Sequence, residues 1–302
     1  MKALRGRASA LLLAALIDAL LGEPPARLHP VVWMGRALSA VEPLLLRGSA
    51  RRQLLAGALV TLGGASACLV LGTLLDRLLA RPPGGWLLHA WLLKGCLAWR
   101  ALDEAAGRVQ GLVAAGDLAS AREALRALVS RDPTTLDREQ IVAAGIESVA
   151  ENFSDSLVAP LLAFLVAGLG GALAYRWLNT ADAMIGYRGH YEWAGKVAAR
   201  LDDVANFLPA RLAAGLLLVV APSRRGVAVL WRDHAQTASP NAGWPMAAMA
   251  GLLDRALEKP GHYRLNAAAP LPDLADLATA RAVVARGWLL ALALAIFGER
   301  RR

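Results

Sequence analysis

The sequence predicts an all-α integral membrane protein with roughly four to six membrane-embedded helices, some of them short or re-entrant, plus a soluble helical hairpin. Two observations predict this class. Hydrophobic residues make up 56% of the 302 residues and charged residues only 19%, whereas charged residues are roughly 25% of an ordinary soluble domain. Residues 53–75 contain no charged side chain, and a helix of that length crosses the roughly 30 Å hydrocarbon core of a bilayer.

The chain lacks repeats and Gly/Ser-rich linkers. We therefore expect a single polytopic membrane domain over residues 1–302, with a soluble helical insertion at about residues 100–150. The net charge of +9 would suggest nucleic acid as a partner of a soluble protein. Here arginines flank apolar stretches, as is typical of contacts with lipid headgroups, and no nucleic-acid-binding motif is present. The lipid bilayer is thus an expected partner, and nucleic acid is not.

The two cysteines, Cys68 and Cys96, both lie in apolar stretches. They form no Cys-x-x-Cys motif, and no histidine stands at metal-ligand spacing from them. We interpret both as buried small hydrophobic side chains, not as a disulfide framework.

Residues 1–22 resemble a signal peptide, but Asp18 interrupts the apolar core and no small-x-small cleavage site follows. We expect this segment to be retained as a short helix that Pro24 and Pro25 terminate. Asp18, Glu23 and His29 then cluster where the helix leaves an apolar environment. An ordinary proline turn, with His29 as its cap, is the alternative.

Four further apolar stretches are weaker candidates for crossing the membrane than residues 53–75. Two polar side chains, His89 and Lys94, interrupt the first of them, whose tryptophans suit the membrane interface. Pro160 and three glycines weaken the second, which is our candidate for a segment that enters the membrane and returns. The third is short for a span. In chain order the stretches are residues 86–99, 156–175, 212–223 and 287–298.

Residues 100–150 have the pattern of a soluble helical hairpin. Gly116 is placed to end one helix and Asp117 to cap the next. Apolar residues at helical spacing follow. Asp132-Pro133 ends this second helix, and Asp137 is placed to cap a third helix that runs into Glu147.

On that third helix, Glu147, Glu151 and Asp155 fall at i, i+4 and i+8, so they share one helix face. Three like charges on one stripe repel each other. A bound cation or a guanidinium would compensate them, and solvation by water is the alternative. Because these carboxylates adjoin sequence apolar enough for a bilayer, a functional role is the usual explanation.

Read together, the polar motifs closely resemble those of the CobD/CbiB family, the adenosylcobinamide-phosphate synthases of cobalamin biosynthesis. The matching pieces run in the family's order over nearly the whole chain, and together they are highly specific. Ala181 and Ala183 depart mildly from the family's pattern, at positions that affect packing more than chemistry. The matching residues are Asp18, Gly22-Glu23-Pro24, His29-Pro30, Leu128-Val129-Ser130-Arg131-Asp132, Glu147-Ser148-Val149-Ala150-Glu151-Asn152, Asp155, Asn179-Thr180, Asp182, Gly186-Tyr187, Ala199-Arg200-Leu201-Asp202-Asp203, Asn206, Pro209-Ala210-Arg211 and Ser239-Pro240-Asn241-Ala242-Gly243.

The resemblance implies a multi-pass ligase of the cell inner (cytoplasmic) membrane, with its site facing the cytoplasm. Such an enzyme joins (R)-1-aminopropan-2-yl phosphate, or aminopropanol, to the free propionate carboxylate of adenosylcobyric acid and forms an amide. ATP as co-substrate and Mg²⁺ are expected, although the sequence has no Gly-x-x-x-x-Gly-Lys-Ser/Thr loop to hold ATP. Association with other cobalamin-assembly enzymes and formation of an oligomer are left open.

The resemblance also assigns site residues. The catalytic candidates are Glu147, Glu151, Asp155, Asp182, Asp202 and Asp203, of which Glu151, Asp155 and Asp182 are the candidate Mg²⁺ ligands. The substrate-binding candidates are Asp18, Glu23, His29, Arg131, Asn152, Asn179, Arg188, Arg200, Asn206, Arg211 and Asn241.

Two other functions are compatible with the sequence. Carboxylates between apolar segments also suit a corrinoid carrier, although the few full-length spans and the soluble hairpin argue against it. A non-catalytic scaffold that docks cobalamin enzymes through residues 100–150 is the second alternative.

Overall fold

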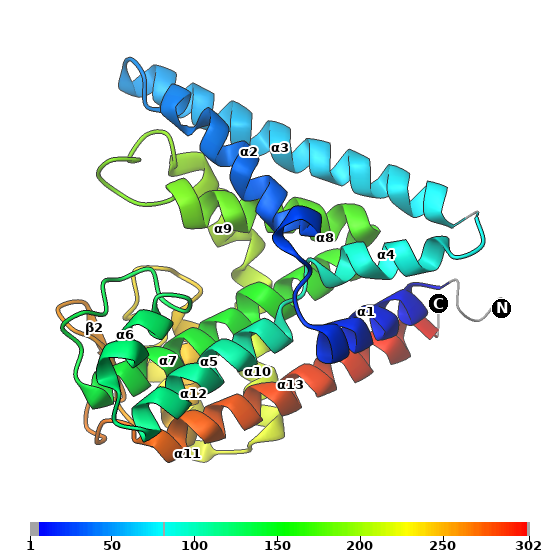
Figure 1. The fold of residues 1–302 in the computed structure, drawn as a ribbon. Coiled ribbons are helices and arrows are strands. Elements are labelled where there is room, and N and C mark those ends of the chain that lie inside the picture. The colour runs from blue at the N-terminus through cyan, green and yellow to red at the C-terminus, as the bar shows by residue number, and fades with distance from the viewer. Residues whose placement is uncertain (1–5, 81, 301–302) are drawn as a thin grey trace. The chain divides into compact units, whose positions relative to one another are not determined.

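The structure is a computed structural model that describes residues 6–80 and 82–300. It divides into two compact units, Met1–Ala98 with Ala159–Asn206 and Leu294–Arg302, and Trp99–Val158 with Phe207–Ala293. The predicted all-α class is confirmed: the described residues are mostly helical, with very little strand (Figure 1). The single-domain organisation stays a prediction.

The first unit consists of helices that come from separate segments of the chain. The predicted N-terminal helix is present from Arg7 to Leu21, while residues 1–5 of that prediction lie outside the described part. The helices of this unit are α1 (Arg7–Leu21), η2 (Ala26–Leu28), α2 (Pro30–Leu45), α3 (Ala50–Leu79), α4 (Gly85–Lys94), α8 (Ala159–Ile185) and α9 (Lys196–Ala205).

Helices α3 and α8 pack closely because small residues let their backbones approach. A side chain at Gly72 would collide with the backbone of Gly170. Further along the same contact, the indole Nε1 of Trp177 donates a hydrogen bond to the carbonyl of Thr61 at 3.1 Å. The glycines of the apolar stretches are therefore needed for helix packing.

The second unit is arranged around one helix that is buried on all sides. Residues 141–150 of α7 are all buried, and this helix contacts α5, α6, α12 and β1. The elements of this unit are α5 (Trp99–Ala114), α6 (Leu118–Leu125), α7 (Arg138–Asn152), η3 (Phe153–Val158), α10 (Phe207–Val220), α11 (Arg224–Asp233), α12 (Gly243–Leu253), β1 (Leu257–Lys259), β2 (Tyr263–Leu265) and most of α13 (Leu274–Arg300).

The predicted caps of the hairpin region are confirmed. Gly116 adopts a φ of 78° after α5, a conformation that glycine reaches without a steric penalty. The Asp117 carboxylate accepts the backbone N–H of Ser120 at 3.0 Å and so caps α6. Asp137 and Gln140 form a complete capping box at the start of α7.

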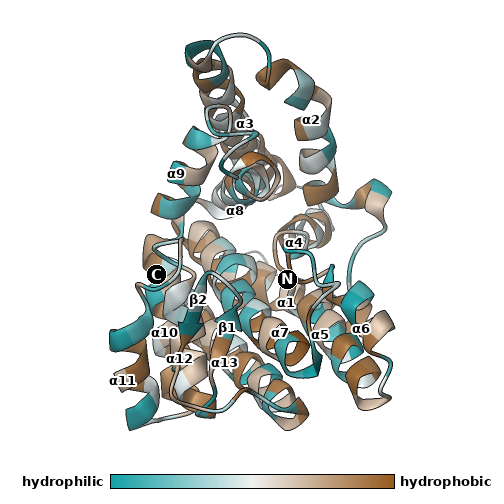
Figure 2. Ribbon diagram, turned by 90° about the vertical axis from the view of Figure 1, so that its left-hand side faces the viewer, coloured by the Kyte–Doolittle hydropathy of each residue, from teal (hydrophilic) through white to brown (hydrophobic). Residues whose placement is uncertain are grey.

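Three helical runs of the described chain are long and apolar enough to cross a membrane: Ala50–Leu79, Arg138–Ile185 and Leu274–Glu299. Helices α9 and α10 would make a fourth if they form one broken span together. Figure 2 shows brown and pale residues along α3, with teal residues gathered on α9 and α11. Residues 53–75 are thus confirmed as part of a helix of spanning length.

One expectation about an apolar stretch needs correction. Residues 86–99 are too short to cross, because α4 ends at Lys94 and a turn at Gly95 and Cys96 follows. The C-terminal apolar stretch at residues 287–298 is confirmed as part of a helix of spanning length, which already starts at Leu274. Its first turns carry charges that contact α5, since Arg281 makes two hydrogen bonds to Asp103 at 2.8 and 2.9 Å.

A short antiparallel hairpin of β1 and β2 was not predicted. Its strands have three residues each, too few for an alternating pattern to be recognised. Tyr263 on β2 brings this hairpin to the acidic helix α7, as described below.

Candidate active site

The connection between α1 and α2 belongs to a cluster of charged side chains in the first unit, most of them largely buried. Glu23 Oε2 lies 2.7 Å from His29 Nε2 and 2.9 Å from Lys94 Nζ, and Asp18 Oδ1 lies 3.3 Å from the same Lys94 nitrogen. The structure therefore brings together the three predicted residues Asp18, Glu23 and His29. It adds Lys94 of α4, whose side chain is fully buried.

His29 also caps α2, as the alternative interpretation proposed. Its Nδ1 accepts the backbone N–H of Val31 at 3.2 Å, so Nε2 carries the proton that is donated to Glu23. Burial alone would raise the pKa of Glu23, but hydrogen bonds from His29 and Lys94 outweigh it and hold the pKa below its ordinary value. Glu23 is thus a carboxylate, and its 31% exposed side chain is the part of the cluster open to the surroundings.

A second polar cluster lies between α8 and α9. Asp202 accepts hydrogen bonds from the side-chain amides of Asn206 at 2.9 Å and Asn179 at 3.4 Å. The Asn206 carbonyl oxygen in turn accepts the Tyr175 hydroxyl at 2.8 Å. Three predicted residues, Asn179, Asp202 and Asn206, are therefore brought together from two helices around one buried carboxylate.

Asp182 lies close to Gly186 near the end of α8. The Gly186 N–H donates to the Asp182 carbonyl at 2.7 Å, and a Cβ at position 186 would collide with the Asp182 carboxylate. A side chain at Gly195 would meet the backbone carbonyl of Ile185. The predicted Asp182 is therefore held where only glycine fits beside it.

The other predicted residues of the first unit are more open. Arg188 and Arg200 are exposed, and the Arg200 side chain is 77% exposed, with its Nη1 3.9 Å from Asp203. Neither arginine is hydrogen-bonded to the buried Asp202. Their assignment to substrate stays a prediction.

In the second unit, the acidic helix α7 is compensated by a guanidinium, one of the possibilities raised by its charge pattern. Arg131 Nη2 donates to Glu147 Oε2 at 2.9 Å, and both side chains are largely buried. Two other nitrogens of Arg131, Nε and Nη1, are buried without a hydrogen bond in the described chain. Tyr263 also lies beside Glu147. Burial is the largest cause that raises the pKa of Tyr263 and the charge of Glu147 is the next, so the hydroxyl stays neutral.

The helix that carries Glu147 and Glu151 changes its geometry before it reaches Asp155. Regular α-helix ends at Asn152, and Phe153–Val158 form a π-helix, an uncommon element that occurs frequently at functional sites. That Asp155 shares a face with Glu147 and Glu151 stays a prediction. A ladder of hydrogen bonds marks the junction: Ser156 donates to Asn152 Oδ1 at 2.9 Å, and Asn152 donates to the Ser148 carbonyl at 3.0 Å.

Arg211 and Asn241, also in the second unit, are neighbours in the structure. Arg211 Nη1 donates to Asn241 Oδ1 at 3.1 Å. The guanidinium carbon lies 3.5 Å from the ring centre of Phe207 and 4.5 Å from that of Trp244. The aromatic rings orient the arginine through cation–π contacts, so the Ser-Pro-Asn-Ala-Gly loop is tied to α10.

A break in α8 forms the last polar feature, in the first unit. The backbone leaves helical geometry at Ala167 and Gly168, so the usual bond between the Leu165 carbonyl and the Leu169 N–H is replaced. Arg7 donates to the Leu165 carbonyl at 3.0 Å, and Asp76 accepts the Leu169 N–H at 3.1 Å. Both backbone groups freed by the break are therefore hydrogen-bonded to ionisable side chains.

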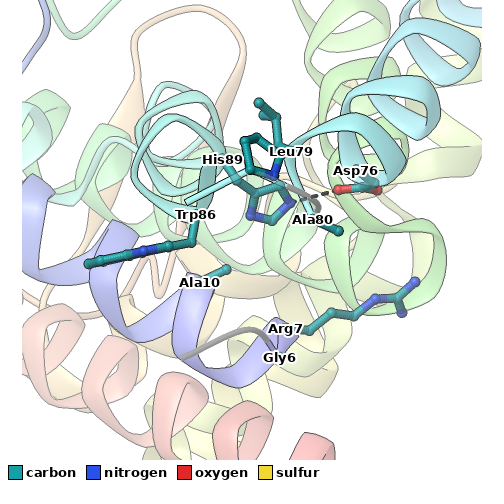
Figure 3. Close-up of a pocket in the computed structure, with 9 residues that line it drawn as sticks. Gly6, Arg7, Ala10, Asp76, Leu79, Ala80, Trp86 and His89 are labelled. Carbon is teal, nitrogen blue, oxygen red and sulfur yellow. Dashed lines mark hydrogen bonds and ion pairs between the residues drawn. The ribbon is translucent and has the colours of Figure 1, made fainter. Parts of the chain in front are cut away.

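A cavity of about 190 Å³ adjoins this break, and Arg7, Asp76 and His89 contribute to its lining. His89 Nε2 lies 2.6 Å from Asp76 Oδ1. Figure 3 shows the His89 ring directed at Asp76 and Arg7 reaching out from the start of α1. The predicted interruption of residues 156–175 at a glycine is therefore confirmed by the break at Gly168. Re-entry of this segment into the membrane stays a prediction.

The comparison with known proteins identifies the family. The family model described as CobD/Cbib protein matches residues 11–290. The chain belongs to the CobD/Cbib family. Proteins named "Cobalamin biosynthesis protein CobD" from Dehalococcoides mccartyi, Rhizobium meliloti and Rhodobacter capsulatus are 44%, 43% and 40% identical to it. The alignments cover 84%, 84% and 92% of this chain and 85%, 82% and 93% of those proteins. No solved structure matches.

In this CobD/Cbib protein, no group of three or more His, Cys, Asp or Glu side chains within residues 6–80 and 82–300 is arranged to hold a metal ion. Glu151 and Asp155 lie on either side of the α7–η3 junction, and Asp182 lies on α8. The metal assignment of these three residues stays a prediction.

Sequence reasoning missed three residues of the clusters in this CobD/Cbib protein: Lys94, Tyr175 and Tyr263. The sequence does mark Lys94 as unusual, because it is a lone charge in an apolar stretch, but there it indicates only an interruption of that stretch. Nothing in the sequence indicates Tyr263, since its contact with Glu147 joins residues far apart in the chain.

Proposed function

We propose that this CobD/Cbib protein is an amide-forming ligase of cobalamin biosynthesis. In this proposal it joins (R)-1-aminopropan-2-yl phosphate, or aminopropanol, to the free propionate carboxylate of adenosylcobyric acid, with ATP as co-substrate. The observation that carries the proposal is the set of buried carboxylates, oriented by amides or a guanidinium, in a membrane chain of this family. The location we expect is the cytoplasmic membrane with the site facing the cytoplasm, where ATP is available.

The proposed chemistry starts from an unreactive carboxylate. A propionate oxygen attacks the γ-phosphorus of ATP, ADP leaves, and an acyl phosphate forms. The amine nitrogen then attacks the carbonyl carbon, phosphate departs with the former carboxylate oxygen, and the nitrogen loses a proton to a base. Most of the work in phosphoryl transfer is positioning and charge stabilisation.

Particular side chains suit particular parts of this reaction. Asp202 is oriented by Asn179 and Asn206, as a general base or a binder of the ammonium group needs to be. Beside Glu147, Arg131 keeps two buried guanidinium nitrogens that have no hydrogen bond to the described part of the chain. Such donors fit an oxyanion of a phosphate or a carboxylate.

Mg²⁺ belongs to the proposal because it is commonly held by one or two carboxylates together with water and substrate phosphates. Glu151 and Asp155, four residues apart at the α7–η3 junction, are the candidates for such a pair, and Asp182 on α8 is a separate candidate. The ion would neutralise charge on the transferred phosphate.

The test is an assay of the purified full-length chain in detergent with adenosylcobyric acid, aminopropanol phosphate and Mg-ATP. We expect adenosylcobinamide phosphate as the product. An Asp182→Asn variant should lose activity by about 10²-fold or more if this carboxylate acts as an acid, base or metal ligand. Unchanged turnover would remove Asp182 from the site, and a folded wild-type sample without product would contradict the proposal.

A corrinoid carrier is the second candidate, and the broken helix α8 favours it. Discontinuous membrane helices are typical of transporters, where they form the substrate and ion sites. Uptake of adenosylcobyric acid into liposomes that contain the protein but no nucleotide would support this function. Absence of uptake, together with product formation, would support the ligase.

A further inference from the structure

Arg176 is a buried charge that none of the clusters above uses. It lies on α8, where residues 159–175 and 177–181 carry no charged side chain. Only 9% of Arg176 is exposed. A charged residue inside a helix of this hydropathy is costly and usually has a functional reason.

The guanidinium of Arg176 is poorly satisfied. Nη1 donates to Asn179 Oδ1 at 3.4 Å, near the limit for a hydrogen bond, and Nε is buried without a hydrogen bond to any described residue. Within the described residues, no carboxylate lies within 4 Å of Arg176. A guanidinium has five N–H donors, and burying it without an anion is strongly unfavourable.

The neighbours do not replace the missing anion. Asn179 bridges to Asp202, but that carboxylate already receives the shorter hydrogen bond of Asn206. Cys96 lies within electrostatic reach of Arg176. Burial raises the pKa of the Cys96 thiol to about 12, and the thiol is directed at the Leu92 carbonyl, 3.7 Å away. Cys96 is therefore neutral and supplies no negative charge.

We propose that Arg176 binds an oxyanion of a substrate, either a phosphate or a carboxylate. This inference rests on the proposed function for the choice of ligand, since the amine carries a phosphate and the corrinoid carries a propionate. The fork of N–H donors matches either group. Asn179, one turn along the helix, links the bound anion to the Asp202 cluster and so places both at one site.

The test compares wild type with Arg176→Gln by thermal unfolding and by calorimetric binding, using the full chain in detergent. The probes are aminopropanol phosphate, unphosphorylated aminopropanol, inorganic phosphate and adenosylcobyric acid. Because the guanidinium lacks an anion in the free protein, Arg176→Gln should unfold at the wild-type temperature or above. It should also lose at least tenfold in affinity for one oxyanion probe and lose the thermal shift that this probe causes.

The pattern of loss identifies the source of the anion. Weaker binding of aminopropanol phosphate and inorganic phosphate, with unchanged corrinoid binding, assigns the phosphate. Weaker binding of adenosylcobyric acid alone assigns the propionate. Arg51→Gln, which changes an exposed arginine of the same unit, is the matched control and should leave all affinities unchanged.

Two outcomes overturn the inference. One is an Arg176→Gln protein that binds every probe as wild type does. The other is a structural role: if Arg176→Gln does not fold, Arg176→Lys retains the charge but not the fork, and wild-type affinity in that variant contradicts oxyanion binding by the guanidinium. Because these measurements need no turnover, they remain informative if amide formation is not observed.

Discussion

At the scale of single residues, the chain stabilises buried charges in small groups whose members come from different elements. Lys94 illustrates this: its side chain is fully buried between Asp18 and Glu23. Removing one member of such a group leaves the others buried without a counter-charge, which costs more than the group contributes when intact.

Replacing Lys94 with Met should therefore lower the free energy of unfolding by about 3–5 kcal/mol. Methionine retains much of the volume of the side chain, so the loss reports the charge of Lys94. Unfolding in detergent by denaturant or heat measures it. The double variant Lys94→Met with Asp18→Asn should recover part of the loss, because a buried charge then disappears as well. No recovery would show that Asp18 and Lys94 are not coupled.

The same cluster predicts a pH dependence. The pKa of Glu23 is lower in the folded protein than its ordinary value of 4.5, since hydrogen bonds from His29 and Lys94 outweigh burial. Its stabilising contribution is therefore complete above about pH 4.5 and is lost as the pH falls through the lowered value. Between pH 5 and pH 3, wild type should lose more stability than Glu23→Gln. Equal slopes would contradict this coupling.

Residue identities were easier to predict than residue partners. Polar motifs beside apolar sequence indicated Asp18, Glu23, Asn179, Asp202 and Asn206, and the structure groups them as described. That a guanidinium can compensate Glu147 followed from charge repulsion alone. That it is Arg131, with Tyr263 opposite, depends on tertiary packing, which helical spacing does not encode.

At the scale of elements, the broken helix α8 is the clearest feature. Gly168 has a φ of 63°, and the two backbone groups freed by the break bond to Arg7 and Asp76. Asp76 thus acts as a cap inside an otherwise continuous helical run, and His89 holds the carboxylate in place.

Replacing Asp76 with Ala should lower the free energy of unfolding by about 0.5–2 kcal/mol, the usual cost of a lost N-cap. Asp76→Asn, which keeps a side-chain oxygen able to accept the Leu169 N–H, is the matched control and should cost less. Thermal unfolding of the two variants in the same detergent measures the difference. If the alanine variant were as stable as the asparagine variant, the cap would not stabilise the break.

Element prediction succeeded where length and hydropathy were decisive. Residues 53–75 lie inside α3, and the caps at Asp117 and Asp137 mark the starts of α6 and α7. The prediction failed at residues 86–99, where α4 ends at Lys94 and this lysine pairs with Asp18 and Glu23. It also missed the π-helix at Phe153, since a one-residue change in helical turn leaves no mark on composition.

At the scale of the whole molecule, the described part of the chain combines three or four helical runs long enough to cross a bilayer with helices that are amphipathic and short. Its two cysteines are useful probes of this arrangement. Cys68 lies within α3, and Cys96 is buried.

In sealed membrane vesicles, neither native cysteine should react with a membrane-impermeant maleimide until the protein is denatured. Burial raises the pKa of Cys96 to about 12, so its reactive thiolate is scarce, and a bilayer would shield Cys68. Ala115→Cys, at an exposed position between α5 and α6, should be labelled from one side of the membrane. Labelling of Cys68 in intact vesicles would contradict a membrane-spanning α3.

Isotope transfer during turnover tests the central claim most directly. Adenosylcobyric acid labelled with ¹⁸O in its free propionate is incubated with the wild-type protein, aminopropanol phosphate and Mg-ATP, and the products are analysed by mass spectrometry. Amide formation through an acyl phosphate predicts adenosylcobinamide phosphate together with inorganic phosphate that carries one ¹⁸O atom. A folded protein that yields neither product would contradict the claim that this chain is the ligase.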